Sequence, residues 1–327
     1  ASAAIHRKQG DLAQAADECR QAIELGVRDP DVIRSTVNLL YQQGQFDDAY
    51  QLLRRIESQQ PGITQSMGRV GSELSLRHAD LSAAVTAARA AAKDSSDPQD
   101  FLWLGQVLAV AAAGAGSAGE GSSAADTLQE AEKALRHGLG LDPARPAAWV
   151  LLVRFLAGAG RKDDAEATIK RAEDSLEREG RLLALAQCYK AIGLIAKAED
   201  CYRQAVADRP NDPVVLRSAA EFYLQQNQPR QAKESVEKML RLGEKLKTSD
   251  THWARRSMAV LMLEGGYRNL LPAIALVDRN LQSPQAANED RCVKAMLLAS
   301  HPRLEERRQS VRMLEEVLRQ DRSLSRY

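Results

Sequence analysis

The sequence has few aromatic residues and no excess of either charge. Aromatic residues make up 4% of its 327 residues, so a folded core must consist mainly of Leu, Ala, Val and Ile. Such a core favours close helix packing over a β-sandwich. Lys and Arg together number 45 against 44 for Asp and Glu, so no net field attracts nucleic acid or an anionic membrane. We therefore expect neither as a partner.

The sequence also has few cysteines, and none of them are paired in a CxxC motif. The four residues, Cys19, Cys188, Cys201 and Cys292, are scattered along the chain. They are best interpreted as small hydrophobic residues rather than as a disulfide framework or a metal site. This allows a reducing compartment, and we predict a cytoplasmic location.

No long, uniformly hydrophobic segment is present. The longest uncharged stretch, residues 101–119, consists of Ala, Gly and Ser in its second half, so we predict no membrane span. Residues 1–10 contain His6, Arg7 and Lys8 and have no apolar signal-peptide core. The chain also lacks an initiator Met. We expect it to be a piece of a longer protein, in which case a targeting segment would lie outside it.

Catalytic motifs are missing as well. The sequence has no dinucleotide or phosphate-binding glycine loop, no HExxH and no G-x-S-x-G. Its five histidines lie far apart, and distant repeats of an elongated array do not converge on one site. We therefore predict a protein that is not an enzyme and that needs no cofactor or metal.

What the sequence does contain is a ladder of alanines at a repeating interval. The steps between its members are 34, 35, 47, 34, 33 and 34 residues, and they join Ala15, Ala49, Ala84, Ala131, Ala165, Ala198 and Ala232. Five positions before each alanine stands a residue that we interpret as a helix-ending turn: Gly10, Gly44, Ala79, Asp126, Gly160, Gly193 and Asn227. A period near 34 with a small residue and a turn in fixed phase predicts a solenoid of helical hairpins.

Each copy of the repeat reads as helix, turn, helix and loop. The pairs Asp29-Pro30, Asp97-Pro98 and Asp212-Pro213 occupy the same phase and predict helix starts, since Asp is a good N-cap and Pro is tolerated at the first helical position. Gly44 predicts a left-handed helix end, and Pro61 closes the second hairpin.

These patterns resemble the tetratricopeptide repeat family, a 34-residue helix-turn-helix unit. The first-helix motif W-x2-L-G-x2-Y is approximated by Trp149, Leu152, Val153 and Leu156, and the second-helix motif by Ala198, Tyr202 and Ala205, followed by Pro210. The resemblance implies an all-α, right-handed superhelical solenoid. We expect about seven hairpins in residues 1–245, and divergent hairpins that continue the solenoid in residues 246–327.

One interval breaks the period. The 47-residue step exceeds it by 13 residues, and the excess falls in the Ala-, Gly- and Ser-rich residues 113–125. This composition predicts a flexible insertion loop within the fourth hairpin. A tolerated insertion is the preferred interpretation, and a contact element is the alternative.

The repeat phase also names positions expected to line the concave groove of the solenoid. These are Arg34, Asn38, Tyr41, Arg69, Glu73, Leu102, Gln106, Val150, Arg154, Leu183, Gln187, Lys190, Arg217 and Glu221. Arg34, Arg69 and Arg217 share one slot, and the set holds five basic residues against two acidic ones. Arginine binds carboxylates bidentately, so an acidic or C-terminal peptide is the predicted ligand. Ordinary solvated charge is an equal alternative.

The function predicted from these observations is a non-catalytic scaffold that binds a peptide or helix of a partner protein. The alternative is a recognition or regulatory segment of a larger enzyme or of a secretion or assembly machine. Nucleic-acid binding ranks third because the charges balance. The Ala-, Arg- and Leu-rich composition suggests a bacterial source. Partner, pathway and oligomeric state do not follow from the sequence.

Overall fold

The computed structural model describes residues 12–116, 121–263 and 266–320, and within these ranges every regular element is a helix. The predicted all-α solenoid of helical hairpins is thereby confirmed. The chain groups into two compact units, residues 1–194 and 195–327. The sequence-based division at residue 245 stays a prediction. Among the described helices, none combines the length and the apolar character that crossing a bilayer requires.

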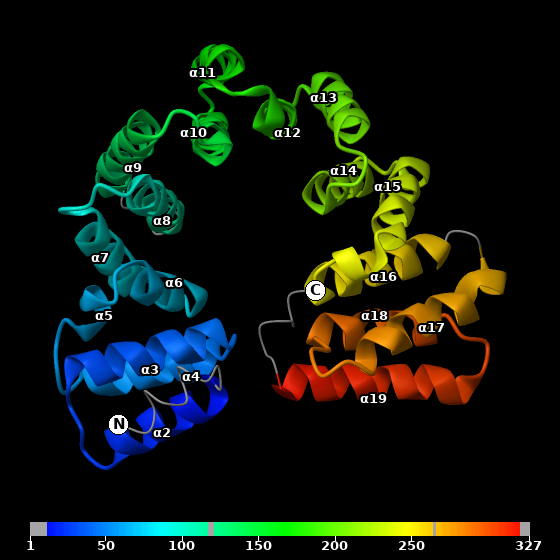
Figure 1. Ribbon diagram of the computed structural model, residues 1–327, viewed down its shortest axis with the longest axis horizontal. Coiled ribbons are helices and arrows are strands. Elements are labelled where there is room, and N and C mark those ends of the chain that lie inside the picture. Colours follow the sequence, from blue (N-terminus) through cyan, green and yellow to red (C-terminus); the bar gives the residue numbers. More distant parts are fainter. Residues whose placement is uncertain (1–11, 117–120, 264–265, 321–327) are drawn as a thin grey trace. The chain divides into compact units, whose positions relative to one another are not determined.

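The first unit consists of successive helical hairpins (Figure 1). Its helices are α2 (Leu12–Glu24), α3 (Pro30–Gln42), α4 (Phe46–Glu57), α5 (Ile63–Ser66), α6 (Arg69–Arg77), α7 (Leu81–Ala92), α8 (Pro98–Gly116), α9 (Gly121–Leu141), α10 (Pro146–Gly158), α11 (Lys162–Ser175) and α12 (Arg178–Ala191). The first helices α6, α8, α10 and α12 contact one another in succession, and a hydrogen bond joins α3 to α6. We call α3, α6, α8, α10 and α12 the inner layer.

The alanine ladder lies in the core of the hairpins, as predicted. All seven of its alanines are fully buried. Ala49, Ala84, Ala131, Ala165 and Ala232 each lie on the second helix of a hairpin, whereas Ala15 lies on α2 and Ala198 on the first helix of the second unit. Five positions before them, Gly44, Ala79, Gly160, Gly193 and Asn227 adopt positive φ angles between 54° and 79°. These residues end the first helix of each hairpin in the left-handed conformation. A small side chain lets the second helix approach the first closely, so the ladder explains how the hairpins close.

Two members of the predicted turn series behave differently. Gly10 lies outside the described residues. Asp126 lies inside α9, so the prediction that it ends a helix was wrong. The aspartates expected at helix starts are confirmed as caps, since Asp29 accepts a hydrogen bond from the N–H of Asp31 and Asp212 accepts one from the N–H of Val214, each at 2.8 Å.

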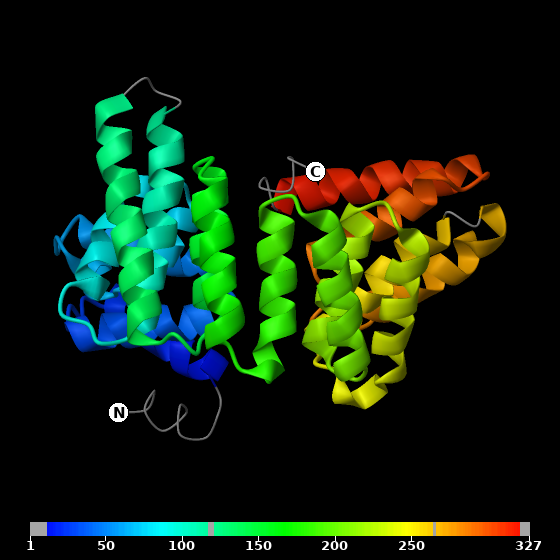
Figure 2. The ribbon, with the colours of Figure 1, turned by 90° about the horizontal axis from the view of Figure 1, so that it is seen from above.

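The structure also corrects the prediction of a flexible loop over residues 113–125. Helix α8 continues to Gly116 and α9 begins at Gly121, so the insertion lengthens both helices, and only residues 117–120 of it lie outside the description. In Figure 2 the two helices project together beyond the neighbouring pairs. The physical reason is packing, because α8 and α9 contact each other extensively and so support helical structure in a segment whose Gly and Ser content suggested a loop.

Glycines bring α8 and α9 close together. A Cβ atom added to Gly105 would lie 2.5 Å from Cγ of Leu135, and one added to Gly138 would lie 2.9 Å from the carbonyl oxygen of Pro98. Real Cβ atoms do not approach other atoms so closely. At both glycines, atoms of one helix of the α8–α9 pair lie close to the backbone of the other. This close packing supports the two long helices.

The second unit also consists of paired helices. They are α13 (Ile195–Asp208), α14 (Pro213–Gln225), α15 (Pro229–Arg241), η1 (Gly243–Lys245), α16 (Thr248–Leu263), η2 (Tyr267–Asn269), α17 (Leu270–Leu281), α18 (Asn288–Ala299) and α19 (Leu304–Gln320). The divergent hairpins predicted in residues 246–327 correspond to α16 with α17 and to α18 with α19.

A buried carboxylate joins three helices of this unit. Asp290, fully buried at the start of α18, accepts hydrogen bonds from Arg256 of α16 and from Asn280 of α17, each at 2.8 Å. Its other oxygen accepts the N–H of Ala287 at 3.0 Å and lies 3.5 Å from Nδ1 of the buried His252. Burial alone would raise the pKa of Asp290, but these hydrogen bonds and the Arg256 charge lower it, so the carboxylate is ionised at neutral pH.

Candidate functional site

Most of the residues that the sequence predicts to bind a ligand lie on the inner layer. Its N-terminal part, formed by α3 and α6, is internally bonded. The Tyr41 hydroxyl donates a hydrogen bond across the two helices to Glu73, whose other oxygen accepts two hydrogen bonds from Arg77 at 2.9 and 3.1 Å. Burial and the Glu73 carboxylate raise the pKa of Tyr41, so its hydroxyl stays protonated and keeps donating. Tyr41 and Glu73 therefore link two repeats.

Two of the three arginines that share a slot also link repeats. Arg69 on α6 pairs with Asp97 at 3.2 Å and with Asp100 at 3.0 Å, both at the start of α8. Arg217 on α14 pairs with Glu221 at 2.9 Å and with Asp250 of α16 at 3.0 Å. These guanidinium groups are already neutralised by carboxylates of the chain, which makes them less available to an acidic ligand.

Arg217 has a further contact in the second unit. Its guanidinium carbon lies 4.8 Å from the centre of the Trp253 ring on α16, within the range of a cation–π interaction. With Asp250, this contact connects α14 to α16. Arg217 and Glu221 thus have a structural role in the described part of the chain, and a role in ligand binding stays a prediction.

Arg34 differs from the other two. It pairs with Asp31 on its own helix, and both side chains are well exposed. Exposed pairs of this spacing contribute little free energy to stability, but the Asp31 carboxylate still neutralises the Arg34 charge. Asn38, one turn further along α3, is half-buried. Their role as ligands for a peptide stays a prediction.

The C-terminal part of the inner layer in the first unit has a different character. Arg154 on α10 is exposed, and Lys190 on α12 is half-buried. Within the described ranges neither has a carboxylate partner. Gln187 lies one turn before Lys190, and Gln106 on α8 donates a hydrogen bond to the carbonyl of Leu102 at 3.2 Å. We call Gln106, Arg154, Gln187 and Lys190 the basic face.

Two apolar positions that the repeat phase placed in the groove are corrected by the structure. Leu102 is fully buried and Val150 is 6% exposed, so both belong to the core. Leu102 contributes to the close α8–α9 contact, since its Cγ would lie 3.0 Å from a Cβ atom at Gly138. Leu183, the third apolar position, is half-buried on α12.

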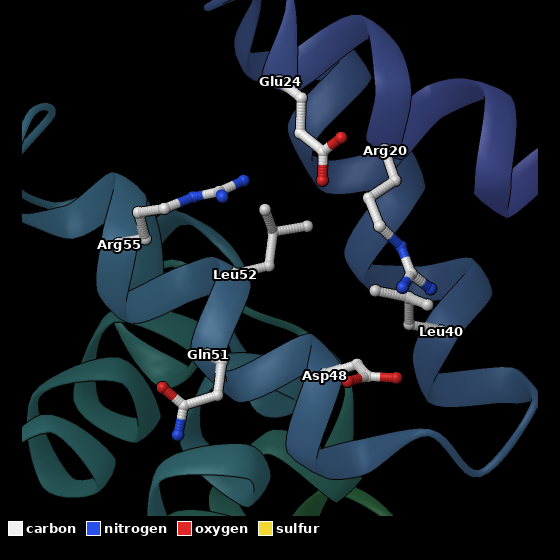
Figure 3. A pocket seen from close by; sticks show the side chains of 7 residues that line it. All are labelled: Arg20, Glu24, Leu40, Asp48, Gln51, Leu52 and Arg55. Atoms are coloured by element: carbon white, nitrogen blue, oxygen red, sulfur yellow. The ribbon is translucent and has the colours of Figure 1, made fainter.

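A pocket of about 280 Å³ is lined by residues of α2, α3 and α4 (Figure 3). Leu40 and Leu52 form its apolar part. Arg20 and Glu24 of α2 and Arg55 of α4 extend toward it with Asp48, so both signs of charge are present and balance. The described residues contain no group of three or more His, Cys, Asp or Glu side chains placed to hold a metal ion.

Sequence reasoning missed the acidic partners of the arginines. Asp100 follows Arg69 by 31 residues, and Asp250 follows Arg217 by 33, so each pair spans nearly one repeat. The same spacing connects Tyr41 to Glu73. A search for opposite charges one period apart would have found these pairs, because that separation brings side chains of neighbouring first helices together.

Comparisons with known proteins agree with the repeat phase. The sequence matches two models of the tetratricopeptide repeat family, one over residues 123–185 and the other over residues 181–212. These ranges contain Ala131, Ala165 and Ala198 of the ladder. No curated protein sequence matches the chain.

Solved structures with similar architecture include a tetratricopeptide repeat protein from Parabacteroides merdae, with 12% identity and a TM-score of 0.49, covering 91% of this chain and 96% of that one. PilF of Pseudomonas aeruginosa is similar at 20% identity and a TM-score of 0.43, with 68% of this chain and 91% of that one covered. The family matches show that the chain contains tetratricopeptide repeats over residues 123–212, and the buried alanines and the turns in fixed phase follow the same repeat elsewhere in the described residues; such repeats generally serve as protein-interaction modules.

Proposed function

We propose that this protein is a non-catalytic interaction scaffold whose inner layer binds an acidic peptide or helix of a partner protein at the basic face. The observation that carries the proposal is that Arg154 and Lys190 lack carboxylate partners in the described ranges, whereas Arg34, Arg69 and Arg217 are paired. A cation without an internal partner retains its full capacity to bind an external carboxylate.

The surrounding sequence supports an acidic ligand. Helix α10 contains no Asp or Glu, and α12 contains only Glu179, in its first turn. Helix α8 contains only Asp100, which is engaged by Arg69 and by Ser95. A peptide carboxylate approaching these three helices therefore meets little repulsion.

The remaining groups of the basic face suit a peptide main chain. The amides of Gln106 and Gln187 each carry donors and an acceptor, which can pair with the N–H and C=O groups of an extended segment. The carboxylates of the peptide would pair with Arg154 and Lys190, and the amides of Gln106 and Gln187 would hold its main chain. This division is typical of repeat proteins that bind peptides along a layer of helices.

The test is fluorescence anisotropy with a labelled peptide of alternating glutamate and leucine, and with its lysine counterpart. We expect the wild-type chain to bind the glutamate peptide more tightly, with an affinity that falls as salt is added. The double variant Arg154→Glu/Lys190→Glu should weaken this binding by about 100-fold, since two attractive charges become repulsive.

Arg34→Glu is the matched control, because it reverses one charge on the same layer at a position that already has an internal partner. Its affinity should change by about twofold or less. Equal binding of both peptides by the wild type, or an equal loss in Arg34→Glu and the double variant, would contradict the proposed site.

A further inference from the structure

Apolar side chains are exposed along one face of α19, the last helix of the second unit. Leu304, Val311, Leu314 and Leu318 are 53%, 56%, 39% and 42% exposed. Their spacings of seven, three and four residues place them within about 80° of the helix circumference. Val317 and Ser310 are buried on another face, where the Ser310 hydroxyl donates to the carbonyl of Ala295 on α18. The exposed residues therefore lie outside the face that contacts α18, and we call them the α19 stripe.

The α19 stripe is not a by-product of the repeat pattern. Among the other second helices of hairpins, α4, α7, α11 and α15 expose no large apolar side chain in the described residues, whereas α9 exposes Leu128 and Leu141 and α17 exposes Leu271. In the described residues none of these helices has more than two such side chains, whereas α19 has four. Contiguous exposed apolar surface on a soluble protein usually marks a contact surface.

The stripe is continuous between its first two members. Arg307 lies between Leu304 and Val311 on the same side, but its guanidinium donates hydrogen bonds to the carbonyls of His301 and Pro302 at 2.9 and 2.8 Å. The charged end of Arg307 is held at the helix start, and its alkyl stem extends the apolar surface.

Two opposite charges border the stripe. Arg308 and Glu315 are both exposed, lie seven residues apart on one edge of the stripe, and have no ion-pair partner within the described ranges. With Val311 and Leu314 as the a and d positions of a heptad, Arg308 and Glu315 both occupy the e position. In an antiparallel pair of helices, e positions face e positions of the partner helix.

We propose that α19 pairs antiparallel with α19 of a second copy of this chain, across a two-fold axis, to form a homodimer. The register that sets Val311 against Leu314 of the other copy also brings Arg308 opposite Glu315, and the symmetry repeats both contacts. Registers displaced by one heptad set Arg308 against Arg308 or Glu315 against Glu315. Charge complementarity therefore selects one register and a second copy as the occupant.

Sedimentation equilibrium on the full chain tests the proposal, at concentrations up to about 200 µM because small interfaces bind weakly. The wild type should form a dimer and Val311→Glu should be monomeric, since each substitution sets a charge against an apolar side chain near the axis. Val214→Glu is the matched control: Val214 is 64% exposed on α14 of the same unit, and this variant should dimerise like the wild type.

A charge exchange examines the register itself. Arg308→Glu and Glu315→Arg should each raise the dissociation constant by about tenfold, because each turns two attractive contacts into repulsive ones. The double variant Arg308→Glu/Glu315→Arg should restore wild-type dimerisation. A wild type that is monomeric throughout, a loss of dimer in Val214→Glu, or a double variant no better than the single ones would overturn the proposal.

Discussion

The hairpins of the first unit and the last hairpins of the second unit are held together differently. In the first unit, fully buried Ala49, Ala84, Ala131 and Ala165 let helices pack closely, and the interhelical ion pairs lie at the surface. In the second unit, the carboxylate of Asp290 is buried between α16, α17 and α18 and is satisfied by their polar groups.

This difference predicts different responses to change. Apolar packing loses stability in proportion to the volume or area altered. A buried charge is stable only while its partners are present, so removing one member leaves the others unsatisfied. We therefore expect the second unit to fail abruptly when its network is broken, and the first to weaken gradually.

The largest effect is expected for Asp290→Ala. Arg256 and Asn280 would lose their acceptor in a buried site, which should destabilise the second unit by about 3 kcal/mol or more. Hydrogen exchange measured by mass spectrometry should show lost protection in α16–α18 and unchanged protection in α10. Asp200→Ala, which removes an exposed pair with Arg203, should cost less than about 0.5 kcal/mol.

The same carboxylate makes stability depend on pH. The pKa of Asp290 is lowered in the folded state, so its contribution is present above the ordinary Asp pKa of about 3.9 and is lost as the pH falls through the lowered value. Denaturation between neutral pH and about pH 3 should show a steeper acid loss for the wild type than for Asp290→Asn. Parallel curves would mean that another carboxylate is responsible.

A smaller effect is expected in the first unit for Gly138→Ala. The added Cβ would lie 2.9 Å from the backbone oxygen of Pro98, and backbone cannot move aside easily, so we expect a loss of about 2 kcal/mol in urea denaturation. Gly140→Ala, two residues further along α9, meets nothing within 4 Å and should stabilise by about 0.5 kcal/mol. Similar effects of the two substitutions would show that α8 and α9 are not closely packed.

The smallest effect concerns the turns. Ala79 adopts φ 58°, where a side chain costs about 1 kcal/mol of folded-state strain. A glycine there would relieve this strain, but its greater freedom in the unfolded chain would offset part of the gain in stability. Ala79→Gly should therefore raise the stability of the first unit by about 0.5 kcal/mol. Gly160, with φ 74° and open space around it, offers the reverse test, and Gly160→Ala should lower stability by about 1 kcal/mol. Thermal denaturation of both variants measures the difference.

Much of the fold could be predicted from the sequence because its signals are local. The buried alanines, the Asp-Pro helix starts and the left-handed turns at Gly44 and Gly193 depend on residues within one hairpin. The prediction failed at Asp126, because the insertion lengthens α9 so that this helix begins at Gly121, before Asp126. An alanine-rich segment with glycine and serine suggested a loop, but long α8 and α9 support each other as helices.

The candidate site was less predictable. The phase of the repeat named Arg69, Arg154 and Arg217 alike as groove residues. Their availability depends on carboxylates from the next hairpin, which are present for Arg69 and Arg217, while Arg154 has none in the described ranges. A single-helix pattern contains no information on that pairing.

The sequence by itself determined the repeat, its period and the residues that close each hairpin, because these follow from contacts between chain neighbours and from backbone preferences. Only the tertiary structure decided which cations stay unpaired on the inner layer and which apolar side chains stay exposed on α19. The physical reason is that ion pairing and burial are properties of several helices together. A side chain that looks the same in two repeats can be neutralised in one and exposed in the other.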